Sequence, residues 1–306
     1  MSHPFCAFYS DTFVLPLPDG HRFPMDKYRR LRERLLQDGV LHPSQLRVPE
    51  AATWDELRLA HDVAYVEEVA NGTVDPAMLR RIGFPWSLEM VERSRRSSGA
   101  TVAAARVAIA SRGMAANLAG GTHHAFADRG EGYCVFNDVA VAARVLLRDG
   151  VIARATVIDC DVHQGNGTAA IFRDDRRVFT CSFHGRSNFP FHKETSDLDV
   201  EFDDGTGDAP YLAALRQHVP EVLDTTRPDV VFYLAGADPY VGDRLGKLAL
   251  TIDGLEQRDR CVLEACQQRG VPVAIAMAGG YCPDIDAIVT IHRNTIAEAM
   301  RITPCH

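Results

Sequence analysis

Short apolar runs alternate with longer amphipathic stretches along the chain, and the two kinds of segment differ in hydrophobic period. The apolar runs are rich in Val, Ile and Ala and lack polar alternation, as is typical of parallel strands buried on both faces. They predict strands at residues 115–118, 155–159, 178–182, 230–235 and 271–277. The amphipathic stretches predict helices at residues 25–37, 87–110, 139–148, 211–224 and 252–269.

Glycines mark the ends of three of these helices. Gly39, Gly150 and Gly270 lie just past a helical stretch, where glycine commonly ends a helix. Pro272 then opens the next strand, at a position where it costs no ladder hydrogen bond. Because strands and helices alternate, we expect an α/β fold with one parallel sheet and helices on both faces.

Polar or glycine-rich segments follow the predicted strands directly. They are Gly120-Gly121-Thr122-His123-His124, Asp159-Cys160-Asp161-Val162-His163, Gly236-Ala237-Asp238 and Gly279-Gly280-Tyr281. In an open parallel sheet the ligand crevice lies at the carboxyl ends of the strands. We therefore expect the histidines, aspartates and tyrosine of these segments to converge at one edge of the sheet.

Two of these segments predict a metal site. Side chains two residues apart in an extended segment point to the same side, so Asp161 and His163 present a carboxylate and an imidazole to one point. Asp238 can add a third ligand, and three ligands with an open position are typical of a catalytic metal. Such a set accepts Zn²⁺ but also Fe²⁺ or Mn²⁺. A single strand-end aspartate more often caps a helix or binds water, but the combination favours the metal.

The remaining side chains at this edge supply acid–base and hydrogen-bonding groups. His123 or His124 could take a proton from water and return one to a leaving amine, because imidazole titrates near neutral pH. The phenol of Tyr281 could donate a hydrogen bond to an oxyanion. The alternatives are a loop histidine held by a backbone carbonyl and a tyrosine that packs in the core or at the rim.

Composition narrows the functional classes. The 306 residues include 33 Lys+Arg and 41 Asp+Glu, a net charge of −8, which argues against a nucleic-acid partner. The longest apolar runs, at residues 230–237 and 271–278, are shorter than a membrane span of 18 or more residues. The 8 cysteines include no C-x-x-C pair, and the first residues lack the pattern of a signal peptide. We expect free thiols, with Cys160 pointing away from the metal, and a cytoplasmic location.

Several motifs together resemble those of the zinc-dependent histone deacetylase superfamily. They occur in the family's order over about residues 20–300. The motifs are Gly121-Thr-His123-His124-Ala125, Gly132-Tyr133-Cys134-Val135-Phe136-Asn137-Asp138, Asp161-Val-His163-Gln-Gly-Asn166-Gly167, Gly236-Ala237-Asp238 and Gly279-Gly280-Tyr281. The Gln164-Gly-Asn-Gly167 ending, the run Gly242-Asp-Arg-Leu-Gly246 and the short N-terminus look most like the class IV branch and its bacterial relatives.

The resemblance implies a single catalytic domain over residues 1–306. Its expected fold is arginase/deacetylase-like, three-layer α/β/α with an eight-stranded parallel sheet. By the same resemblance Asp161, His163 and Asp238 bind one catalytic Zn²⁺ per chain. His123 and His124 lie beside the metal-bound water, with His124 preferred as general base, and Tyr281 polarises the scissile carbonyl.

Residues behind the two histidines are also implied by the resemblance. Asp159 matches the carboxylate behind His123. Asn166 lies behind His124, where class I enzymes have Asp, and a neutral partner should lower the stability of the His124 imidazolium.

The resemblance extends to a substrate tunnel and to ion sites. Tyr133 and Phe189 match tunnel walls, although core packing is the commoner fate of an aromatic side chain, and Gly132 would offer its carbonyl to the substrate amide. A structural K⁺ would be held through groups of Asp159, Asp161, His163, Ser182 and Phe183. Arg22 matches an arginine that lines an internal exit channel, with a solvated surface arginine as the alternative. We expect the basic helix at residues 27–34 to present a solvated face.

The resemblance therefore predicts a zinc-dependent amidohydrolase that removes acetyl or longer acyl groups from lysine in peptides or proteins. A small-molecule deacylase, for example for acetylpolyamines, would use the same machinery and stays an alternative. A dinuclear manganese ureohydrolase would need further carboxylates after Gly236, but Asp238 is followed by Pro239-Tyr240. A ligand sensor with a dead site is disfavoured by the intact ligand set and Tyr281. No feature indicates an oligomeric state.

Overall fold

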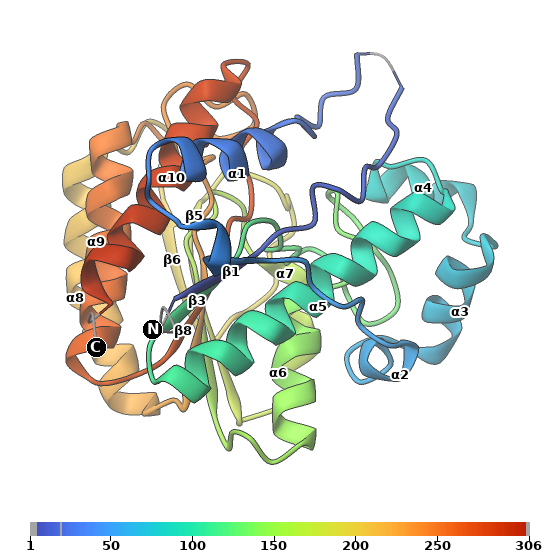
Figure 1. The fold of residues 1–306 in the computed structure, drawn as a ribbon, viewed down its shortest axis with the longest axis horizontal. Coiled ribbons are helices and arrows are strands. Elements are labelled where there is room, and N and C mark those ends of the chain that lie inside the picture. The colour runs from blue at the N-terminus through green and yellow to red at the C-terminus, as the bar shows by residue number, and fades with distance from the viewer. Residues whose placement is uncertain (1–4, 19, 304–306) are drawn as a thin grey trace.

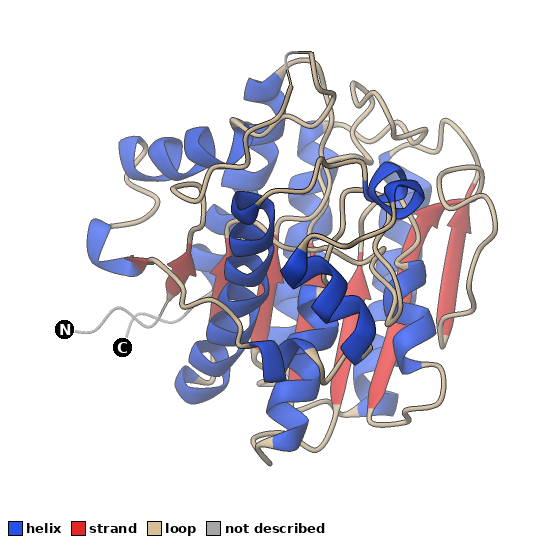
Figure 2. Cartoon of the chain, turned by 90° about the vertical axis from the view of Figure 1, so that its right-hand side faces the viewer, coloured by secondary structure: helices blue, strands red, loops and turns tan. Residues whose placement is uncertain are grey.

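A parallel sheet of eight strands runs through the middle of the molecule (Figures 1 and 2). The computed structural model describes residues 5–18 and 20–303, and its strand order is β2-β1-β3-β8-β7-β4-β5-β6 with every neighbouring pair parallel. The strands are β1 (Cys6–Phe8), β2 (Leu46–Arg47), β3 (Met114–Asn117), β4 (Ala155–Asp159), β5 (Val178–Gly185), β6 (Leu198–Phe202), β7 (Val230–Leu234) and β8 (Val273–Ala276). The predicted single-domain α/β fold is confirmed.

Helices cover both faces of this sheet and make the three layers expected (Figure 1). They are α1 (Lys27–Gln37), α2 (Trp54–Leu57), α3 (Val63–Asn71), α4 (Pro76–Ile82), α5 (Leu88–Ser111), α6 (Asp138–Arg148), α7 (Asn166–Phe172), α8 (Asp208–Thr226), α9 (Ile252–Gln268) and α10 (Ile285–Ile302), with a short 3₁₀ turn at Pro43–Gln45. Apolar side chains of α1, α8, α9 and α10 form one core with the sheet, and those of α2–α6 form a second.

The predicted strands correspond to β3, β4, β5, β7 and β8, and the predicted helices to α1, α5, α6, α8 and α9. Gly39, Gly150 and Gly270 follow the ends of α1, α6 and α9 with φ of 64°, 66° and 65°, the left-handed conformation that glycine adopts freely. The strands β1, β2 and β6 and the helices α2–α4, α7 and α10 lie outside the predicted set. A run of two or three residues, as in β2 and β1, is too short to show a hydrophobic period.

The sheet order explains how distant segments reach one site. The strands β3, β8, β7 and β4 are consecutive neighbours, and each leads into one of the polar segments singled out above. Because all four strands are parallel, these segments leave the sheet at the same edge.

Two further expectations concern the cysteines and the membrane. Every cysteine among the described residues is a free thiol, and Cys305 lies outside them. Cys160 is buried within the apolar core on the α8–α9 side. Within the described chain, none of the helices combines the length and apolar character needed to cross a bilayer.

Candidate active site

Asp161, His163 and Asp238 form a compact buried cluster at the carboxyl edge of the sheet. One potential ligand atom from each lies within 4.8 Å of the other two. His163 Nδ1 is 2.8 Å from Asp161 Oδ1 and 3.2 Å from Asp238 Oδ2. The structure thus brings together the three side chains predicted as metal ligands. That they bind Zn²⁺ stays a prediction.

Two observations show that these residues fit a metal ion. Asp238 Oδ2 is buried and has no hydrogen-bond partner among the described residues, although a buried carboxylate oxygen normally has one. A Cβ built on Gly279 would lie 1.9 Å from Asp238 Oδ2 and 2.6 Å from Asp161 Oδ2. The glycine therefore leaves room for two carboxylates that need a cation between them.

The electrostatics of the cluster favour a positive charge. Burial raises the pKa of Asp238, and the neighbouring Asp161 raises it further, to about 7. Burial opposes the charged form of His163, but the close Asp161 and Asp238 carboxylates outweigh it and raise the pKa of His163 to about 10. A metal cation supplies the same charge and releases these protons on binding.

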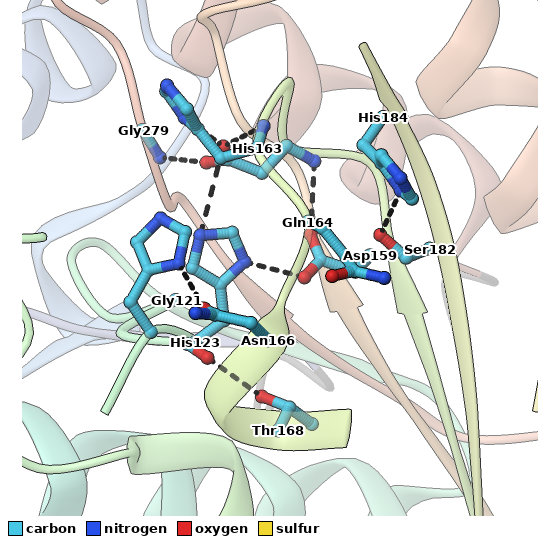
Figure 3. Close-up of polar contacts among 12 residues, drawn as sticks. Gly121, His123, Asp159, His163, Gln164, Asn166, Thr168, Ser182, His184 and Gly279 are labelled. Carbon is cyan, nitrogen blue, oxygen red and sulfur yellow. Dashed lines mark hydrogen bonds and ion pairs between the residues drawn. The ribbon is translucent and has the colours of Figure 1, made fainter. Parts of the chain in front are cut away.

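Backbone amides hold the carboxylates in place. Gly279 N–H donates to Asp161 Oδ2 at 2.8 Å (Figure 3), and Val162 N–H donates to Asp238 Oδ1 at 3.0 Å. Each aspartate therefore has an oxygen held by a backbone amide of the segment that follows another strand.

His123 and His124 lie beside the cluster with different partners. His123 Nδ1–H donates to Asp159 Oδ2 at 2.6 Å (Figure 3), and His124 Nδ1–H donates to Asn166 Oδ1 at 2.7 Å. The Asn166 amide is oriented by Glu131, whose Oε1 accepts from Asn166 Nδ2 at 2.7 Å. Because Nδ1 carries its proton, the Nε2 of a neutral His124 ring keeps a lone pair.

The two histidines differ in pKa because their surroundings differ. Burial disfavours the charged form of His123, but the Asp159 and Asp161 carboxylates outweigh it and raise the pKa of His123 to about 9. Burial and the adjacent His123 hold the pKa of His124 well below its usual value. The hydrogen bond to Asn166 raises the pKa of His124 but does not offset these effects.

Tyr281 faces the same space, and its backbone is anchored. Burial and the nearby Asp161 and Asp238 raise the pKa of the phenol well above its usual value, so it stays a hydrogen-bond donor. Its N–H donates to Asp243 Oδ2 at 2.6 Å. Lys27 Nζ donates to the carbonyl oxygens of Ala278 at 3.4 Å and Gly280 at 3.2 Å, just before the tyrosine.

Lys27 is a residue that the sequence analysis placed wrongly. It is 2% exposed, because α1 packs against α10 and turns this side chain toward the segment before Tyr281. Three other cations of that helix follow the expectation of a solvated face: Arg29, Arg30 and Arg34 are exposed and pair with nearby carboxylates. Arg32 is partly buried and pairs with Asp11.

A cavity of about 380 Å³ leads from the surface to His124, His163 and Tyr281, and Gly132, Tyr133 and Phe189 line it. The Phe189 ring stands edge-on to His124, with centroids 4.9 Å apart at 84°. A Cβ on Gly132 would lie 2.6 Å from His124 Cδ2, and its φ of 57° also favours glycine. The structure places all three predicted tunnel residues at this cavity, and their contact with substrate stays a prediction.

A second, internal cavity of about 70 Å³ lies on the other side of His123 and Tyr281. The arginine that lines it is Arg93. Arg22 is exposed at the surface, so the alternative of a solvated arginine holds and the role in an internal channel is wrong. Arg93 Nη1 donates to the Ser10 and Phe13 carbonyls at 3.1 and 3.3 Å. The sequence offered no signal for Arg93, since it lies on the long helix α5 among other arginines.

The predicted potassium residues lie on the adjacent strands β4 and β5 and in the segment that follows β4. Ser182 is paired with Asp159 in the β4–β5 register, and its Oγ is 2.9 Å from His184 Nδ1 (Figure 3). The Phe183 carbonyl accepts a hydrogen bond from the Tyr211 hydroxyl at 3.5 Å. Nothing in these contacts tests potassium binding, which stays a prediction.

Comparison with known proteins decides the family. The model of the histone deacetylase domain matches residues 21–296. The chain belongs to the histone deacetylase family. It is accordingly a hydrolase of the deacetylase type. The predicted class IV relationship is not settled by this match.

Sequence similarity to known proteins extends over most of this histone deacetylase family member. An uncharacterized protein of Picosynechococcus sp. is 46% identical and is aligned over 94% of this chain and 96% of its own. Histone deacetylase 2 of Arabidopsis thaliana is 31% identical over 89% of this chain and 72% of its own. A solved histone deacetylase homolog in complex with SAHA has a TM-score of 0.82 at 24% identity, covering 97% and 84% of the two chains. The last similarity supports the fold.

Proposed function

We propose that this deacetylase removes acetyl or longer acyl groups from the lysine side-chain amine of peptides or proteins. One Zn²⁺ held by Asp161, His163 and Asp238 would assist the hydrolysis. The observation that carries the proposal is the buried cluster at the inner end of the 380 Å³ cavity, with His163 and Tyr281 on its wall. Tunnels of this kind suit a long, thin acyl-lysine side chain.

The protein's own residues supply proton transfer at the attacking water. When bound, Zn²⁺ polarises the acyl carbonyl and lowers the pKa of a water molecule toward about 7. His124 Nε2 has a free lone pair because Nδ1–H is committed to Asn166. This nitrogen accepts the proton of the attacking water, and the histidine pair protonates the departing amine.

Tyr281 acts on the carbonyl oxygen. Its raised pKa keeps the phenol protonated, so it donates a hydrogen bond as negative charge develops on that oxygen. The bonds from Lys27 and to Asp243 hold the backbone on both sides of the phenol. Asp159 orients His123, and Gly132 would offer its carbonyl to the amide N–H of the substrate.

Other parts of the proposal rest on the sequence. The sequence predicts a class IV relationship, a cytoplasmic location and the lack of a nucleic-acid partner. It also predicts a structural K⁺, held by Asp159, Asp161, His163, Ser182 and Phe183. Fe²⁺ in place of Zn²⁺ would use the same three ligands.

A panel of three substrates tests the proposed activity. We expect acetyl-lysine and long-chain acyl-lysine peptides to exceed an acetylpolyamine in kcat/KM by about tenfold. The reason is that Arg80, Arg81 and Lys247 line the cavity and their positive charges repel the cationic polyamine. Release of the free amine by the purified protein is the measurement. A higher kcat/KM for the acetylpolyamine would favour the small-molecule alternative instead.

A further inference from the structure

The mouth of the substrate cavity is basic, although the chain as a whole carries a charge of −8. Arg80, Arg81 and Lys247 line this cavity, and no aspartate or glutamate of the described residues does. The two arginines come from the end of α4 and the lysine from the loop after β7, so the charges reach the mouth from two distant segments.

These cations have few partners within the protein. Arg80 and Arg81 make no side-chain hydrogen bond or ion pair with any residue of the described ranges 5–18 and 20–303. Lys247 Nζ lies 3.0 Å from Ser187 Oγ and 3.8 Å from Asp204 Oδ2. The guanidinium groups are therefore available to an anion from outside.

Acidic side chains close in sequence to the lining segments have partners of their own. Glu131 accepts from Asn166, and Asp203 pairs with Arg186 at 2.5 Å. The Asp243 carboxylate accepts three backbone N–H groups, those of Leu245, Gly246 and Tyr281, at 2.8, 2.9 and 2.6 Å. The Asp204 carboxylate lies 3.8 Å from Lys247 Nζ and offsets part of its charge, so the uncompensated charge of the mouth is mainly that of Arg80 and Arg81.

Hydrogen bonds fix the charged segments to the cavity walls. The carbonyl of Arg81 accepts from Gly132 N–H at 2.9 Å, and that of Ile82 accepts from Tyr133 N–H at 2.7 Å. On the other segment, Lys247 N–H donates to Asn188 Oδ1 at 3.3 Å, beside Phe189. The backbones that carry these cations are therefore tied to residues that line the cavity.

Arginines at a helix C-terminus also interact with the helix dipole, and that role alone would leave substrate choice unaffected. It does not account for Lys247, which comes from a loop, or for the absence of acidic residues from the described lining. We propose that the mouth selects substrates that carry a carboxylate next to the acylated amine, foremost acyl-lysine flanked by acidic residues. This inference rests on the proposed deacylase function.

The same mouth offers an apolar surface that favours a peptide. Phe191 is 81% exposed and lines the cavity, with its ring edge-on to Phe189 at 6.3 Å. An exposed aromatic ring at a binding site commonly packs against a partner. A free acetylated amino acid shares the carboxylate chemistry but does not reach this ring as well as a peptide does.

Matched peptides test the inference. One acetyl-lysine peptide carries Asp and Glu flanks, a second carries Lys and Arg flanks, and Nε-acetyl-lysine with its free carboxylate is the third substrate. We expect kcat/KM to be about tenfold higher for the acidic than for the basic peptide at low salt, and the ratio to fall as salt screens the charges. If Nε-acetyl-lysine were turned over as fast as the acidic peptide, the preference for a carboxylate would stand. The substrate would then be a small molecule and not a peptide.

A charge-reversal variant locates the preference. Arg80→Glu/Arg81→Glu should invert the ratio of acidic to basic peptide. Arg176→Glu is the matched control, because Arg176 is exposed and lies before β5, at the opposite edge of the sheet, and it should keep the wild-type ratio.

The outcomes separate this inference from the proposed function. Equal kcat/KM for both peptides, or a preference that survives in Arg80→Glu/Arg81→Glu, would overturn the inference while deacylation stands. No turnover of any acyl-lysine substrate would overturn the proposed function itself.

Discussion

Replacing Asp238 with alanine should abolish turnover and release the metal. Asp238 supplies one of only three protein ligands in the proposed site, and its Oδ2 is the buried oxygen without a hydrogen bond. Loss of the metal removes several kcal/mol of transition-state stabilisation, so we expect kcat/KM to fall by roughly 10³-fold or more.

Metal content and acetate release, measured on the same preparation, check this result. Asp238→Asn keeps the size of the side chain and an oxygen that can accept from Val162 N–H, so it separates loss of the ligand from loss of folding. Asp174→Ala, at an exposed aspartate far from the cavity, is the control and should bind metal and turn over normally. Full activity of Asp238→Ala would remove this residue from the ligand set.

Replacing Tyr281 with phenylalanine should lower kcat by roughly 10²–10³, as the loss of one oxyanion donor does. The phenol lines the cavity beside His163, with ring centroids 6.3 Å apart, and its hydroxyl is the only part removed. Because metal ligands are untouched, metal content should stay at the wild-type level.

Steady-state kinetics of Tyr281→Phe and Tyr240→Phe distinguish a chemical role from a packing role. Within the described chain, the Tyr240 hydroxyl has no hydrogen-bond partner, so its removal should leave kcat unchanged. If Tyr281→Phe were as fast as the wild type, the hydroxyl would have no part in stabilising the carbonyl oxygen.

The central part of the fold could be predicted from the sequence because parallel strands carry a local signal. Residues 155–159 and 230–235 are continuous apolar runs, and they form β4 and β7 in the middle of the sheet. The polar segments directly after them carry Asp161 and Asp238. Once the strands are known to be parallel, their shared edge follows, and with it the cluster that the structure shows.

Other features depend on packing between segments far apart in the chain. The charged stretch at 27–34 predicts a solvated helix, yet Lys27 is buried because α1 lies on α10 and beside the segment before Tyr281. Arg22, only a few residues away, is exposed. The orientation of the helix in the fold decides which cation of a basic stretch is buried. The sequence pattern contains no information about that orientation.

The contacts that orient the site residues were equally out of reach. Glu131 holds the Asn166 amide across 35 positions of sequence, and Asp243 meets the Tyr281 amide across 38. The basic mouth is of the same kind, since Arg80, Arg81 and Lys247 are unremarkable surface cations until the loops are assembled. The local hydrophobic period and the composition do not predict such contacts between distant segments.

Reconstitution of the metal-free protein with Zn²⁺ tests the central claim most directly. The chelated protein is titrated with Zn²⁺ while the release of acetate from an acetyl-lysine peptide is measured. We expect no turnover before addition, a linear rise, and a plateau at about one Zn²⁺ per chain, as a site with three protein ligands and an open position implies. Turnover by the metal-free protein, or a requirement for two Mn²⁺ per chain, would contradict the account.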